Sequence, residues 1–455
     1  MRRRERTPLA AVLVAGLLLA WPAAWNGYPL VFADTGTYLG QAIRLYLGWD
    51  RPPFYSLFLH ALHWRITLWP VPLAQGLIAA HLLALSLRAL DLPGAVPLLA
   101  AAGLLAVGTG LPWFATQLMP DVFTGLLVLA LWLLGFAGWR LGRMERVYLL
   151  ALATLAVAVH LAHLPLAAGL ALVGGLLAWR SGGARPALVP VGWMAAPVCL
   201  AVLGLVAANA AGHGRAAVSP FGSVFLAARL LDDGPALRTL DARCAKEAWQ
   251  VCALRDRLPM HANDFLWPPD GPLRGALGGG KAWAAEASAI VAATLASEPA
   301  AVARAVAGNG LRQFGMLGTG DGLEPWPAEP GPEALIREHF PAELAAFRAA
   351  RQYGGALLAD ARALSPLHVA TAWLGLLTLP VLVWLCRRNL PAVALAVFVL
   401  AAAAGNAAVT GGLSGPNERY QARIAWLLAF APAAILPAAC LPRRGRGRPL
   451  VRHPV

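Results

Sequence analysis

Long apolar runs constrain the fold of this chain more than any other feature. Several runs approach or exceed the ~20 apolar residues that an α-helix needs to cross a bilayer. The composition agrees, since 58% of the residues are hydrophobic, only 13% are charged, and the mean hydropathy is +0.60. Outer-membrane barrels show alternating segments of about ten residues instead, and the sequence has no such pattern. The sequence therefore predicts an all-α polytopic membrane protein.

The apolar runs predict about ten transmembrane helices. The first run carries two tryptophans near its end, where residues of the membrane interface are expected, and this favours an uncleaved helix over a cleaved signal peptide. The ten predicted helices cover 8–25, 70–90, 95–113, 121–139, 147–163, 165–179, 187–209, 366–386, 390–408 and 422–441.

The arginines predict the orientation of these helices. If the N-terminus is cytoplasmic, the inner segments hold "RRRER", "RLGRMER", "CRRN" and "PRRGRGRP", whereas the short outer loops hold only scattered arginines. The positive-inside rule then places both termini in the cytoplasm of a bacterium, with the chain in the inner membrane. We attribute the net charge of +14 to this topology and expect no nucleic-acid partner, because no platform of aromatic and basic residues accompanies the charge.

This topology divides the chain into four parts. Residues 1–209 form an N-terminal transmembrane core that includes a first outer loop, 26–69. Residues 210–365 form a long segment on the outer, periplasmic face, either soluble or interfacial. The C-terminal transmembrane helices follow at 366–441, and 442–455 form a basic cytoplasmic tail.

The first outer loop begins with a single carboxylate, Asp34, in "FADTGTYLG". Residues 35–64 are too polar to span a bilayer, yet their apolar residues recur at helical spacing. We therefore expect two amphipathic helices in the membrane interface, joined at Asp50-Arg51-Pro52-Pro53.

Two further groups of polar residues share the outer face. Asp121 follows Pro120 and opens a helix, where a carboxylate suits the positive end of the helix dipole whether or not it also belongs to a site. His160 and His163 are three residues apart and therefore lie on one helical face. They are candidate substrate-binding residues, although histidines in membrane proteins often only satisfy interior hydrogen bonds.

The last outer loop, "SGPNERYQARIAWLL", holds Arg419, Tyr420 and Arg423 at the start of the final helix. Arginines on the outer side run against the charge bias of the chain. Because Arg419 and Arg423 are four residues apart, they can project from one face and bind a phosphate group at the interface. An ion pair with Glu418 or a membrane anchor is the alternative.

The long outer segment contains three amphipathic stretches, at 222–234, 282–299 and 299–317, and a pair of cysteines. Cys244 and Cys252 are eight residues apart, which is ~12 Å on an uninterrupted helix and too far for a disulfide. The periplasm is oxidising, however, so we predict a Cys244–Cys252 disulfide with a turn between the two residues. Zinc-ligand spacings, phosphate-binding glycine loops and serine-hydrolase motifs are not recognisable in the sequence.

Together these motifs resemble the GT-C superfamily of membrane glycosyltransferases, which includes protein mannosyltransferases and the aminoarabinose transferase of lipid A. "FADTGTYL" is similar to the acidic first-loop motif of that superfamily, and "DRPPFYSLFL" to its "HPPL" segment, with Arg51 where histidine is commoner. "LMPDVFTG" and "NERYQARIAWLL" match its second-loop acidic residue and its late "RY" loop. The resemblance covers the layout of 1–210 and 366–441, and it departs from the family in lacking a paired Asp-Glu.

The resemblance implies an inverting transfer of a sugar from a polyprenyl-phosphate carrier to an acceptor, which is a glycan, a lipid or a protein. Asp34 would act as the general base on the acceptor hydroxyl. Arg419 and Arg423, or a divalent cation (Mg²⁺ or Mn²⁺) near Asp121, would stabilise the leaving phosphate. Asp50 is a further supporting acid.

Two other classes of function remain open at this point. The first is a transporter or flippase of a lipid-linked or polar substrate. Transporters place ionisable residues near the bilayer midplane and are often built from repeated halves, whereas the charges here lie at the outer rim. The second is a non-catalytic assembly protein that retains the same fold.

Overall fold

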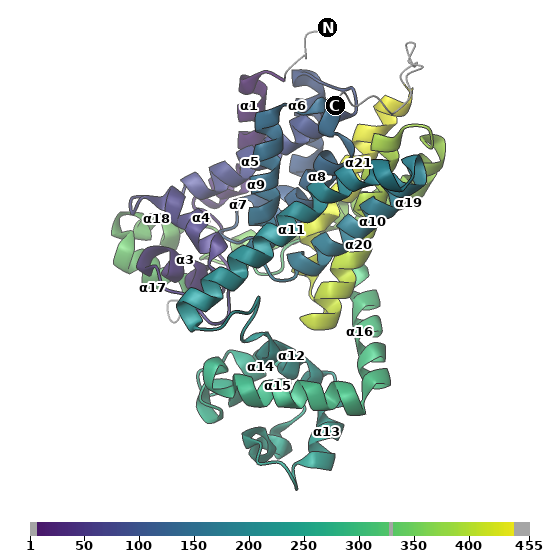
Figure 1. Cartoon of the computed structure of the whole chain (residues 1–455). Coiled ribbons are helices and arrows are strands. Elements are labelled where there is room, and N and C mark those ends of the chain that lie inside the picture. Colours follow the sequence, from purple (N-terminus) through teal and green to yellow (C-terminus); the bar gives the residue numbers. More distant parts are fainter. Residues whose placement is uncertain (1–6, 327–330, 441–455) are drawn as a thin grey trace.

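The structure is a computed structural model that describes residues 7–326 and 331–440, and Figure 1 shows it as a bundle of helices with a smaller helical unit at one end. Within those two ranges there is no β-strand, only an isolated parallel bridge between Leu30 and Gln117. The predicted all-α class is confirmed.

The helices of the first half are α1 (Leu9–Leu19), α2 (Trp21–Asn26), α3 (Thr35–Arg44), α4 (Phe54–His63), α5 (Pro70–Ala89), α6 (Ala95–Gly108), α7 (Leu111–Thr116), α8 (Val122–Phe136), η1 (Gly138–Arg140), α9 (Arg143–Ala158), α10 (His163–Gly182) and α11 (Ala184–His213). Those of the second half are α12 (Gly222–Asp232), α13 (Pro235–Arg243), η2 (Gln250–Arg257), α14 (Ala262–Leu266), η3 (Pro272–Ala276), α15 (Gly280–Ser297), α16 (Pro299–Phe314), α17 (Pro332–His339), η4 (Pro341–Glu343), α18 (Leu344–Ala349), α19 (Ala356–Leu385), α20 (Leu390–Leu413) and α21 (Glu418–Cys440).

All ten predicted transmembrane positions hold a helix, but only some of these helices are long and apolar enough to cross a membrane. In the described part of the chain, α5, α10, α11, α19 and α20 meet that standard, and a sixth span results if α15 and α16, bent by 100°, are taken as one. These helices identify a membrane-embedded protein. At ~1.5 Å per residue, even the 15 residues of α8 extend only ~22 Å, short of a ~30 Å hydrocarbon core. The other predicted spans, and the cytoplasmic termini, stay predictions.

Helix α8 forms the centre of the bundle. It packs against α5, α9, α10, α11, α20 and α21, and nearly all of its side chains are buried. Glycine permits the close approach of α21, because a Cβ on Gly125 would lie 2.5 Å from the ring of Trp426. Small residues at such crossings are the usual means of tight packing between membrane helices.

The two predicted interfacial helices of the first outer loop are present as α3 and α4. The long outer segment, by contrast, has no single fold. Helices α12–α15 enclose a hydrophobic core of their own, and we call residues 222–297 the outer subdomain. Helix α16 then runs back along α20, while α17 packs against α3 (Figure 1).

The outer subdomain holds the predicted disulfide. Cys244 follows α13, Cys252 lies in η2, and the two form a disulfide with a Cα–Cα distance of 5.7 Å. The chain turns between them, which brings their Cα atoms within the range that a disulfide requires. Figure 1 places the subdomain at the end of the bundle opposite the start of α1 and the end of α21.

Candidate functional site

A short extended segment ties the first outer loop to the second. The Leu30 amide donates to the Thr116 carbonyl (3.1 Å), and the Leu118 amide donates to the Leu30 carbonyl (2.8 Å). The Thr35 hydroxyl also donates to the Leu118 carbonyl (3.1 Å). These bonds fix the backbone just before Asp34 against the backbone that leads to Asp121.

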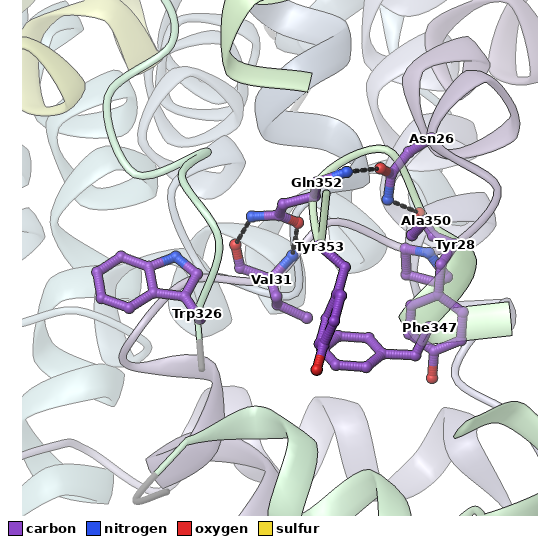
Figure 2. A pocket seen from close by; sticks show the side chains of 9 residues that line it. Asn26, Tyr28, Val31, Trp326, Phe347, Ala350, Gln352 and Tyr353 are labelled. Atoms are coloured by element: carbon purple, nitrogen blue, oxygen red, sulfur yellow. Dashed lines mark hydrogen bonds between the residues drawn. The ribbon is translucent and has the colours of Figure 1, made fainter. Parts of the chain in front are cut away.

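Gln352 holds the other edge of this segment (Figure 2). The Val31 amide donates to its Oε1 (3.0 Å), and its Nε2 donates to the Val31 carbonyl (2.8 Å), as a neighbouring β-strand would. The backbone N–H of Gln352 donates to Asn26 Oδ1 (2.7 Å). The side chains of Trp326, Phe347 and Tyr353 line a small pocket beside it. Because side-chain amides can donate and accept at once, this clamp depends on glutamine.

Asp34 precedes the first turn of α3 and pairs with Arg51 from the α3–α4 junction. Arg51 Nη2 lies 2.8 Å from Asp34 Oδ2, and the two side chains keep 19% and 23% of their surface exposed. The guanidinium also lies 5.4 Å from the ring centroid of Trp267 in the outer subdomain. Asp34 is thus oriented by an arginine and still accessible from solvent.

Arg51 contacts Asp50 through the backbone of Asp50 and Asp34 through its carboxylate. Arg51 Nη1 donates to the Asp50 carbonyl oxygen (3.1 Å). Burial raises the pKa of the Asp50 carboxyl, and the charge of Arg51 acts against that rise. Asp50 therefore belongs to the surroundings of Arg51, and within residues 7–326 and 331–440 no hydrogen bond or ion pair joins it to the second acid, Asp121.

Asp121 lies at the N-terminal end of α8 and is completely buried with two arginines from the first turns of α21. Its Oδ1 is 3.2 Å from Arg423 Nη1 and 3.3 Å from Arg419 Nε. The side chains of Asp121 and Arg423 have no exposed surface, and that of Arg419 has 5%. Arg423 Nη2 also donates to Asn406 Oδ1 (3.4 Å), a polar residue of α20. Two guanidinium groups thus share one carboxylate.

The rings of two aromatic side chains, Phe32 and Tyr420, lie against these arginines. The Arg419 guanidinium carbon lies 3.8 Å from the ring centroid of Phe32, two residues before Asp34. It is 5.6 Å from the Tyr420 centroid, and Arg423 is 5.3 Å from the same ring. Cation–π contacts of this kind stabilise an arginine that is withdrawn from water.

The two predicted histidines meet the same cluster at the start of α10. His163 Nε2 is 2.7 Å from the Thr124 hydroxyl of α8, and its Nδ1 is 2.6 Å from the Ala156 carbonyl, so both ring nitrogens are occupied. Burial lowers the pKa of His160, in the turn before α10, well below its usual value, and the charge of Arg423 acts in the same direction. The neutral form of His160 is therefore favoured, and its Nδ1 accepts a hydrogen bond from the Ala162 amide (3.2 Å).

The Asp34 and Asp121 clusters lie close enough to share a neighbour, Tyr38 of α3. Burial raises the pKa of the Tyr38 hydroxyl. Four charged groups from three distant parts of the sequence also act on this hydroxyl: Arg51, Asp34, Asp121 and Arg419. The N-terminal ends of α3, α8, α10 and α21 therefore converge at one site.

The site has no ready set of metal ligands. In the residues that the structure describes, no three or more His, Cys, Asp or Glu side chains are grouped so as to hold a metal ion. The predicted divalent cation stays a prediction. The positive charge that the structure does place here belongs to Arg51, Arg419 and Arg423.

The structure thus brings most of the predicted site residues together at one place. Asp50 contacts Arg51 only through its backbone, and the cysteine pair lies apart, in the subdomain. The sequence did not single out Phe32, Tyr38, Thr124 or Asn406. Asn406 carried a signal, since it is a polar residue in an otherwise apolar helix and such residues are costly in a membrane. No protein-family model, characterised protein or solved structure matches this chain.

Proposed function

We propose that this protein is a membrane-embedded inverting glycosyltransferase, which moves a sugar from a polyprenyl-phosphate carrier to an acceptor hydroxyl on the outer face of the membrane. One observation carries the proposal: Asp34 is an accessible carboxylate, and Phe32, two residues before it, lies 3.8 Å from Arg419, one of the two buried arginines paired with Asp121. A base and a cationic group at one site are what such a transfer requires.

Asp34 supplies the base in this mechanism. The carboxylate accepts the proton of the acceptor hydroxyl while the acceptor oxygen attacks the anomeric carbon from the side opposite the phosphate. The bond from that carbon to the phosphate oxygen breaks, and its electron pair leaves with the polyprenyl phosphate. Arg51, 2.8 Å from Oδ2, fixes the carboxylate and leaves its other oxygen available for the proton.

Arg419 and Arg423 favour the charge that develops on the leaving phosphate. They place two positive charges against the single negative charge of Asp121. The N-terminal ends of α8, α10 and α21 add the positive ends of three helix dipoles. Asp121 Oδ2 and Arg423 Nε, both buried, have no hydrogen-bond partner within residues 7–326 and 331–440. Buried polar atoms without a partner are rare in protein cores, and a bound ligand is one way to complete their hydrogen bonds.

The position of the charges also bears on the transporter alternative. The ion pairs of the site lie at helix ends and in loops, not in the middle of the long apolar helices. A carrier that alternates between the two faces usually has its ionisable residues at the midplane. The enzyme is therefore the reading that the structure supports better.

The test is an Asp34→Asn variant of the full chain in proteoliposomes, assayed with a panel of polyprenyl-phosphate sugars for release of polyprenyl phosphate. Loss of a general base lowers the rate by roughly 10²–10⁴-fold. The matched control is Asp270→Asn, which changes an exposed carboxylate of the outer subdomain and leaves the rate unchanged. A wild-type rate in Asp34→Asn, with the protein folded and inserted, would remove Asp34 from the mechanism.

A further inference from the structure

A second candidate site lies where the two helices of the first outer loop end. Arg44 closes α3, Arg65 follows the end of α4, and His339 closes α17. With Ile43 they line a cavity of about 340 Å³, which we call the basic cavity. Its size is within the usual range for small-molecule sites. Figure 1 shows α3, α4, α17 and α18 grouped at one side of the bundle, away from the outer subdomain.

The charges of the basic cavity favour an anion. In the part of the chain that the structure describes, one acidic side chain pairs with it: Glu338 lies 3.0 Å from Arg44 and 3.2 Å from His339. Arg44 and Glu338 are both about half exposed, and ion pairs of that kind contribute little. The Arg65 guanidinium makes one long hydrogen bond, from Nη2 to the Ile43 carbonyl at 3.5 Å. Arginine donors are thus available to an incoming phosphate.

Large apolar side chains surround the basic cavity on the outside. Trp64 and Ile66 flank Arg65 and are 64% and 69% exposed. Leu45 and Tyr46, which follow Arg44, are also exposed. Basic residues interleaved with exposed aromatic and aliphatic residues are typical of surfaces that lie in a membrane interface.

The backbone holds these side chains outward at a conformational cost. Leu45, Trp64 and Arg65 have φ angles of 51°, 44° and 57°, in the left-handed region where glycine usually ends a helix. Side chains retained at such positions are commonly there for a function, because the strain persists only when the surroundings impose it. Here the conformation turns Trp64 outward and leaves Arg65 at the cavity.

The position along the chain places this surface at the membrane. Ile66 comes four residues before α5, one of the helices long enough to span a bilayer. Four residues reach at most ~14 Å, so Arg65 and its neighbours lie near the end of that span. This is the depth of lipid headgroups.

We propose that the basic cavity binds the phosphate of an anionic phospholipid of the outer leaflet. Arg44 and Arg65 contact the phosphate oxygens, His339 completes the wall, and Leu45, Trp64 and Ile66 lie against the lipid next to the headgroup. The inference does not depend on sugar transfer, since none of these residues touches Asp34 or Asp121.

The test compares the full-length protein in detergent micelles with the double variant Arg44→Gln/Arg65→Gln, using water-soluble dihexanoyl-phosphatidylglycerol and dihexanoyl-phosphatidylcholine. Binding is measured from the ligand-dependent shift of the unfolding temperature. Each arginine near an anionic lipid contributes roughly a five-fold factor, so the variant should lose roughly 25-fold in affinity for phosphatidylglycerol and little for phosphatidylcholine. Arg238→Gln is the matched control, because Arg238 of the outer subdomain is likewise about half exposed and paired with a glutamate, Glu298, which directly follows the subdomain.

Three results would overturn the proposal. One is equal affinity of the wild type for the two lipids. Another is an Arg44→Gln/Arg65→Gln variant that binds phosphatidylglycerol as the Arg238→Gln control does. The third is protection by inorganic phosphate as strong as that by phosphatidylglycerol, which would assign the cavity to a free anion. A second variant, Trp64→Gly, keeps the charges and relieves the backbone, so it should fold, retain the phosphate contacts and still bind the lipid more weakly.

Discussion

Asp121→Asn tests whether the buried carboxylate holds the site together. The substitution keeps the size of the side chain and an oxygen that accepts hydrogen bonds, but it removes the charge that Arg423 and Arg419 share at 3.2 and 3.3 Å. Both guanidinium groups are buried, and breaking a buried ion pair from one side typically costs ~3–5 kcal/mol. We therefore expect Asp121→Asn to lose about that much free energy of unfolding, a large share of the ~5–15 kcal/mol of an ordinary domain.

Asp34→Asn is the comparison for this prediction. The Asp34–Arg51 pair is partly exposed, so solvent screens it and its loss should cost about 1 kcal/mol or less. Each variant replaces one carboxylate with an amide. The two losses of stability are expected to differ because Asp121 is buried and Asp34 is partly exposed.

The assay is unfolding by denaturant in mixed micelles, followed by tryptophan fluorescence, since Trp426 of α21, three residues after Arg423, is buried against α8 near the cluster. A second variant, Asp121→Asn/Arg423→Gln, restores the net charge of the cluster and should recover part of the loss, as a double-mutant cycle measures. The reasoning fails if Asp121→Asn stays within about 1 kcal/mol of the wild type, or if the two effects in the double variant simply add.

The clamp before Asp34 and the crossing of α19 with α21 give two more predictions. In Gln352→Glu the side chain cannot donate to the Val31 carbonyl, and an unmade bond to a buried group costs ~1–3 kcal/mol. We expect lower stability and slower sugar transfer, because Asp34 is displaced. Unchanged kinetics would contradict this positioning role. Gly375→Ala would put a Cβ 1.8 Å from the Leu428 carbonyl oxygen, so α19 and α21 must separate. We expect poor insertion or a fall in the unfolding temperature of the purified protein. A wild-type melting curve would disprove the close crossing.

Local pattern was sufficient for part of the candidate site. Arg419 and Arg423 were predicted to act together because a spacing of four places them on one helical face, and in the structure both approach the same carboxylate. His160 and His163 were paired by the same argument. The different surroundings of the two histidines were not visible in that argument, because Thr124, which contacts Nε2 of His163, is 39 residues away, and the carbonyl of Ala156 reaches Nδ1 only because the chain turns between α9 and α10.

The outer segment shows where local pattern was insufficient. The three amphipathic stretches at 222–234, 282–299 and 299–317 correspond to α12, α15 and α16, so periodicity placed the helices well. It did not show that α12 and α15 share a core while α16 leaves it to pack along α20. That division depends on which apolar faces fit each other. Gly411 of α20, for example, lies against the α16 backbone, and this contact exists only in the folded chain.

The sequence by itself determined that this is a helical membrane protein, since apolar runs must form helices to satisfy their backbone in lipid. It also placed Asp34 and Asp121 among the candidate residues, and the family resemblance gave them different expected roles, a general base and a supporting acid. The tertiary structure decided how far each carboxylate is buried. Asp121 is buried by arginines 298 and 302 positions away in the sequence, whereas Asp34 pairs at the surface with Arg51, 17 positions away. Burial is a property of segments that meet only after folding, and it is burial that leaves Asp34 as the accessible carboxylate of the two.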